Sequence, residues 1–142
     1  MNAKNKLIVS NFIEEIWNNR KFDQIDDFIS SCFTDYSLPP NLLGNKEGMI
    51  SWIIQVGASF NHKTIIESIV AEEDKVMLKI KMELDHIGIW RNIKPTHKQI
   101  STVGYRYYKL ARGKINEHWC LLDGNSIENQ LQASTHGCKI QQ

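Results

Sequence analysis

A regular alternation in the middle of the chain restricts the fold more than any other feature of the sequence. Apolar residues occupy every second position in this stretch: Val76, Leu78, Ile80, Met82 and Leu84. Most of the residues between them are charged. Successive side chains of a strand point to opposite faces, so the pattern predicts a strand with one buried and one solvated face.

Further strands are expected on both sides of this one. A run rich in β-branched residues covers 64–70, and the polar segment 72–75 between the two runs is typical of a hairpin turn. Two more strands are predicted, from about Ile100 to Leu110 and from Ile115 to Asp123, joined across 111–114. The second half of the chain is therefore predicted to form an antiparallel sheet.

The first half has helical spacing instead. Apolar residues recur at this spacing in a first helix: Ile8, Phe12, Ile13, Ile16 and Trp17. A second, short helix is expected to begin at Asp23, to bury Ile25, Phe28, Ile29 and Cys32, and to stop before Pro39-Pro40. A third helix is expected to carry Met49 and Ile53 and to end near Phe60.

Helices followed by antiparallel strands are typical of the α+β class. We expect a strongly curved antiparallel sheet whose concave side is closed by three N-terminal helices. The 142 residues suffice for one domain, predicted over 1–132, with a polar tail at 133–142.

Composition and charge exclude several function classes. The net charge of +1 gives no field that would favour nucleic acid or an anionic membrane as a partner. No segment has the length and apolarity of a membrane span or of a signal peptide. The cysteines (Cys32, Cys120 and Cys138) are odd in number and far apart, which argues against a disulfide scaffold or a metal site. We therefore expect a cytoplasmic protein.

Three local patterns resemble one known family. They are the opening helix around 11–18, the segment 86–96 with its His-x-Gly-x-Trp start, and the strand 113–119 followed by Asp123. In this order and spacing they resemble SnoaL-like polyketide cyclases, also called ester cyclases, of the NTF2-like superfamily. The resemblance covers about residues 5–131. It implies a cone in which helices and a curved sheet enclose an apolar pocket.

The chain also departs from the family pattern. A His often follows the Asp-Tyr pair in the family, whereas here Asp35-Tyr36 leads to Ser37 and Leu38. His97 stands where a Gly usually follows Pro-Thr. These departures concern the lining of the pocket, and hence the substrate, more than the fold.

The resemblance implies a chemistry that needs neither metal nor cofactor. In these cyclases an intramolecular aldol closure joins two carbons of one small, largely apolar carbonyl compound. The resemblance assigns the acid/base role to Asp123, whose pKa an apolar pocket would raise. The alternative is a solvated Asp in the turn 122–125.

A second catalytic candidate and a pocket lining follow from strand parity. His86 shares parity with the apolar residues of its strand, so it would face the cavity; a purely structural His is the alternative. Trp119 and Leu121 share parity with Asp123, which turns His118 toward the surface or an interface. The predicted substrate-binding set is Trp119, Leu121, Tyr105, Trp17 and Ile53, with helix-to-sheet packing an open alternative for Trp17.

Two functions of different classes are consistent with this sequence. One is a cyclase or isomerase with an Asp acid/base. The other is a non-catalytic module that binds a small hydrophobic molecule or dimerises, since NTF2-like domains serve many roles. An epoxide hydrolase would need an Asp–Arg–Asp arrangement, which the resemblance does not supply. A homodimer through the sheet is also expected, with the strand that carries Tyr105 and Tyr107 and the face that carries His118 and Cys120 as candidate contacts.

Overall fold

The computed structural model describes residues 2–133, and the rest of the predicted tail lies outside the described residues. The chain runs in the order α1 (Asn2–Phe12), η1 (Ile13–Asn18), η2 (Phe22–Asp27), β1 (Ile29–Asp35), α2 (Lys46–Ser59), β2 (Phe60–Glu72), β3 (Lys75–His86), β4 (Gln99–Ala111), β5 (Lys114–Leu122) and α3 (Gly124–Gln132). The segment η1 is a π-helix that continues α1, and η2 is a 3-10 helix.

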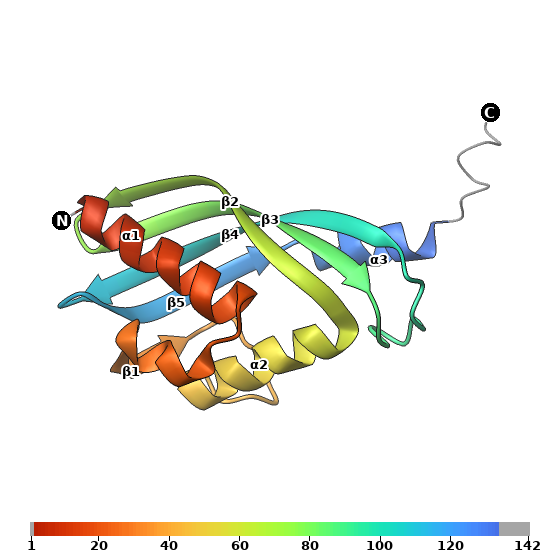
Figure 1. Ribbon diagram of the computed structural model, residues 1–142, viewed down its shortest axis with the longest axis horizontal. Helices are drawn as coiled ribbons and strands as arrows, with labels where there is room; N and C mark the ends of the chain where they lie inside the picture. Colours follow the sequence, from red (N-terminus) through yellow and green to blue (C-terminus); the bar gives the residue numbers. More distant parts are fainter. Residues whose placement is uncertain (1, 134–142) are drawn as a thin grey trace.

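The described strands form one curved sheet in the order β1-β5-β4-β3-β2 (Figure 1). Neighbouring strands from β2 to β5 are antiparallel, and β1 lies parallel to β5 at one edge. In Figure 1, α1 lies across one face of the sheet and α2 lies beside the same face, while α3 continues from the end of β5. The α+β class with a curved sheet is thus confirmed.

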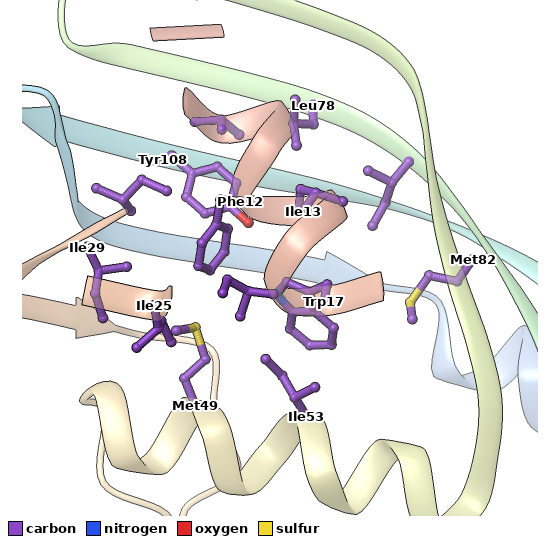
Figure 2. Packing of buried hydrophobic residues seen from close by; sticks show 14 of the residues in the cluster. Phe12, Ile13, Trp17, Ile25, Ile29, Met49, Ile53, Leu78, Met82 and Tyr108 are labelled. Atoms are coloured by element: carbon purple, nitrogen blue, oxygen red, sulfur yellow. The ribbon is translucent and has the colours of Figure 1, made fainter. Parts of the chain in front are cut away.

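The core lies between this face of the sheet and the helices. Figure 2 shows Phe12 and Ile13 meeting Leu78 and Tyr108 of the sheet. All four side chains are buried. The apolar positions of the central alternation, Val76, Leu78, Ile80, Met82 and Leu84, are all buried, as their period predicts.

The predicted second helix is wrong beyond its first turns. Residues 22–27 are helical, but Ile29–Asp35 form strand β1, in which Ile29 and Phe33 are buried and Cys32 is exposed. This segment pairs with β5, which lies far away in the sequence. The pairing satisfies its backbone and overrides the local helical spacing.

A bulge near the start of β5 reverses the predicted parity of that strand. Leu110 pairs with Ile115 while Lys109 pairs with Glu117, so Asn116 is an extra residue without an opposite partner. Beyond it, the odd-numbered positions turn outward. His118 therefore faces the interior of the molecule, and its predicted surface position is wrong.

None of the helices among residues 2–133 combines the length and the apolarity needed to cross a membrane. The longest of them, α2, has 14 residues and begins at the N-cap Asn45, whose side chain accepts a hydrogen bond from the Gly48 N–H. This cap fixes the start of the helix that forms one wall of the pocket described next.

Candidate ligand-binding and proton-transfer site

A cavity of about 560 Å³ opens between the inner face of the sheet and the helices. Its walls are mainly aromatic and aliphatic: Trp17, Leu38, Trp52, Val56, Phe60, Met82, Leu84, Ile89, Trp90, Leu121, Leu122 and Ile127. A mostly apolar chamber with a few convergent polar groups is typical of a small-molecule site. The polar groups on its wall include Asp35, Arg106 and His118.

These three residues form a hydrogen-bonded relay. His118 Nδ1 lies 3.0 Å from Asp35 Oδ2, and His118 Nε2 lies 3.2 Å from Arg106 Nη1. The other carboxylate oxygen, Asp35 Oδ1, accepts a hydrogen bond of 2.9 Å from the Ser37 N–H. All three relay side chains are buried.

The contacts of His118 define its protonation state. A guanidinium can only donate, so Nε2 must accept the hydrogen bond from Arg106. The ring proton is then on Nδ1, from which it is donated to Asp35. Burial lowers the pKa of His118; the hydrogen bond with Asp35 opposes the shift and the charge of Arg106 reinforces it. The imidazole is therefore neutral near pH 7.

Arg106 is the cation of the relay and is only 3% exposed. Its guanidinium carbon lies 4.3 Å from the centroid of the Trp17 ring, a cation–π contact. The hydroxyl of Tyr108 is also buried, but it does not meet the geometry of a hydrogen bond with any described group. Arg106 Nε likewise has no acceptor within the described residues.

Strand register brings the relay together from three separate parts of the chain. The parallel pairing of β1 with β5 places Asp35 opposite His118. In the antiparallel pair β4–β5, Tyr108 stands opposite His118 and Arg106 opposite Cys120. Arg106 and His118 thus lie diagonally across one face, within reach of long side chains.

Asp123 does not have the predicted position. It is exposed, and its carboxylate accepts a 2.9 Å hydrogen bond from the Ser126 N–H as the N-cap of α3. The last strand ends at Leu122, so the following Asp starts a helix instead of facing the cavity. The placement predicted for Asp123 is wrong, and we do not assign the acid/base role to it.

His86 faces the interior, as its parity predicts, but it does not line the pocket. Its Nδ1 accepts a hydrogen bond of 3.1 Å from the Thr96 N–H, and its ring packs 5.3 Å from the ring of Phe60. Burial lowers the pKa of this imidazole. The contacts show His86 holding the loop that returns from β3 to β4, and not touching the cavity.

The predicted substrate-binding set divides in the structure. Trp17 lines the pocket, whereas Leu121, which is 78% exposed, borders only its edge. Ile53 lies in the core beneath Trp17 (Figure 2). The remaining two lie off the pocket: Tyr105 is 50% exposed, and Trp119 stacks on Tyr36 at 4.6 Å between ring centroids.

Sequence reasoning missed the three relay residues as a site. One signal was available: Arg106 has the same parity as the buried residues Tyr108 and Leu110, so a cation was predictable on the inner face of β4. The bulge at Asn116 concealed the matching position of His118.

Comparisons with known proteins agree with this architecture. The sequence model of the SnoaL-like polyketide cyclase family matches residues 7–131. No curated protein matches the chain. Among solved structures, IdmH from Streptomyces antibioticus has a TM-score of 0.82 at 17% identity, covering 91% of this chain and 99% of IdmH.

Two further solved structures are similar. AclR from Streptomyces galilaeus has a TM-score of 0.78 at 23% identity, with 91% of this chain and 96% of AclR covered. A SnoaL-like polyketide cyclase from Agrobacterium tumefaciens has a TM-score of 0.72 at 17% identity, with 87% and 94% covered. At these identities the structural likeness concerns the fold.

Proposed function

This chain belongs to the SnoaL-like polyketide cyclase family, and we propose that it catalyses proton transfer on a small apolar carbonyl compound bound in the pocket. An intramolecular aldol cyclisation or an isomerisation is the reaction type that we propose. The observation that supports it best is the buried Asp35–His118–Arg106 relay on the wall of an apolar chamber. This relay takes the role that the sequence assigned to Asp123.

The first step is removal of a proton from the carbon next to a carbonyl group. The carbonyl oxygen of the substrate accepts the hydrogen bond that Arg106 otherwise donates to His118 Nε2. The freed lone pair of Nε2 takes the carbon-bound proton, and the electron pair of the C–H bond passes into an enolate. Asp35 stabilises the imidazolium that forms, while Arg106 stabilises the enolate oxygen.

The second step forms the new bond and returns the proton. In a cyclisation the enolate carbon attacks a second carbonyl carbon of the same molecule. The oxygen of this second carbonyl becomes an alkoxide. The imidazolium of His118 gives its Nε2 proton to that alkoxide, which restores the neutral ring. In an isomerisation the proton returns to a different carbon. Neither reaction consumes or releases another molecule.

The surroundings of the relay favour this chemistry. The three relay side chains are buried, so the hydrogen bonds and charges among them interact more strongly than in solvent. The hydrogen bond from the Ser37 N–H holds Asp35 in place against the His118 ring. An imidazole whose pKa is below its ordinary value stays available as a base at neutral pH.

The test is exchange of carbon-bound hydrogen in apolar 1,3-diketones dissolved in D₂O, followed by NMR. We expect the protein to accelerate this exchange. In His118→Asn the exchange rate should fall by roughly 10²- to 10⁴-fold. His97→Asn, the same change at an exposed His off the pocket, is the matched control and keeps the full rate. Equal rates in wild type and His118→Asn would refute the proposal.

A non-catalytic binding module is the second candidate, and one observation favours it. The base nitrogen of His118 already accepts a hydrogen bond from Arg106, so the relay is closed in the structure. If this closure persists with a ligand present, the pocket binds but does not catalyse. Saturable binding of a diketone without accelerated exchange would establish this function in place of the first.

A further inference from the structure

Among the described residues, the buried side-chain atoms of the pocket lining that lack a hydrogen-bond partner are all donors. Two buried side-chain nitrogens on pocket-lining residues lack a hydrogen-bond partner among the described residues: Arg106 Nε and Trp17 Nε1. Both a guanidinium and an indole can only donate. Buried donors without acceptors are costly. Both atoms are covered by protein, so a ligand in the cavity reaches the guanidinium of Arg106 from the side that lines the pocket.

The acceptors of the relay are already in use. Each oxygen of Asp35 accepts a hydrogen bond, one from the Ser37 N–H and one from His118. His118 Nε2 accepts from Arg106, whose guanidinium also lies beside the hydroxyl of Tyr108. The free hydrogen-bonding groups of the relay therefore belong to its cationic end.

The charge of that end is not directly paired. Among the described residues, no carboxylate lies within ion-pair distance of Arg106, because the His118 ring separates it from Asp35. The guanidinium is nonetheless buried, and its neighbours, the Trp17 ring, the neutral imidazole of His118 and the hydroxyl of Tyr108, carry no negative charge. A buried cation without a direct counter-ion strongly favours an anion beside it.

We propose that this pocket selects a ligand that carries a carboxylate in addition to its reacting carbonyl group, and binds that carboxylate at Arg106. The apolar body of the ligand lies against the aromatic wall formed by Trp52, Phe60 and Trp90. A guanidinium matches a planar oxyanion through two parallel hydrogen bonds. The inference deepens the proposed function, since it names the substrate class of the same pocket, and it rests on that function.

The test compares aromatic acids with their uncharged amides. Benzoate, 2-naphthoate and anthracene-2-carboxylate form a series of increasing size, and each is paired with the corresponding carboxamide. Binding is followed by tryptophan fluorescence, because Trp17, Trp52 and Trp90 line the pocket, and is confirmed by calorimetry. We expect the best-fitting acid to bind at least about tenfold more tightly than its amide.

Arg106→Met removes the charge and keeps the approximate length of the side chain. It should abolish the preference for acid over amide while leaving amide affinity unchanged. If this variant does not fold, the double variant Arg106→Met/Asp35→Asn removes both charges of the relay and serves the same purpose. Arg112→Met is the matched control, since Arg112 is exposed in the turn between β4 and β5 and lies off the pocket; it should change the preference by less than about threefold.

Several results would overturn the proposal. They are equal affinity for acid and amide at every size, failure of all three acids to bind, or a preference that survives in Arg106→Met or is lost in Arg112→Met. Because binding is measured without turnover, the inference and the proposed function can fail separately. Acid preference without hydrogen exchange would remove the catalytic proposal alone, and exchange without acid preference would remove this one.

Discussion

Acid should destabilise this protein through His62, which is buried on β2. Neither ring nitrogen of His62 has a hydrogen-bond partner among the described residues, and the ring meets Trp17 edge-on at 6.1 Å between centroids. Burial, reinforced by the charges of Arg20 and Arg106, lowers the pKa of His62 from 6.5 to about 4. The folded protein therefore binds this proton far less readily than the unfolded chain.

The sign and size of the effect follow from linkage. Between pH 6.5 and pH 4 the unfolded chain binds the proton first, so the free energy of unfolding falls as the pH falls. Each pKa unit corresponds to about 1.4 kcal/mol, which gives a loss of about 3 kcal/mol when the whole window is crossed. Above pH 6.5 the imidazole is neutral in both states and the contribution is constant.

The assay is urea unfolding of wild type and His62→Phe at a series of pH values from 7 to 4. We expect similar stability of the two proteins at pH 7, and a loss between pH 6.5 and 4 that is smaller in the variant by about 2 to 3 kcal/mol. His97→Asn, a change at an exposed imidazole, should keep the slope of wild type. Parallel pH profiles for wild type and His62→Phe would refute the reasoning.

Two further predictions concern Asp123 and the outer face of the sheet. Asp123→Ala removes the cap of α3 and should lower the free energy of unfolding by about 1 kcal/mol in urea titrations, with hydrogen exchange in diketones unchanged; a large loss of exchange would return the acid/base role to Asp123. The stacked rings of Trp119 and Tyr36, beside the half-exposed Tyr105, favour a homodimer through this face, so Tyr105→Glu should give monomers in sedimentation. A wild type that sediments as a monomer at micromolar concentration would contradict the dimer.

Elements whose signal is local were predictable from the sequence. The alternation from Val76 to Leu84 predicted β3 and its buried face, because a period of two can bury one face only as a strand. The turn at 72–75 and the helix α2 follow from equally local signals. Strand β1 was not predictable in this way, because its partner β5 is distant in sequence and Ile25, Phe28, Ile29 and Cys32 also fit a helical face.

The site was harder to predict than the fold because its position depends on a single extra residue. Without the bulge at Asn116, strict alternation would align Glu117 and Trp119 with the buried Ile115 and turn His118 outward, which is the arrangement predicted from the sequence. With the bulge, His118 lies between Asp35 and Arg106.

The two arrangements differ in how their buried charges are compensated. Arg106 lies on the inner face of β4 in either case, because it alternates along the strand with the buried residues Tyr108 and Leu110. In the regular register Glu117 would be its acidic neighbour and would neutralise it directly. In the bulged register a neutral imidazole takes that place and separates Asp35 from Arg106, so the guanidinium lines the cavity without a direct ion pair. Bulges are often found beside functional sites because they re-aim side chains. Here the bulge replaces a closed ion pair by a relay that can still accept a ligand.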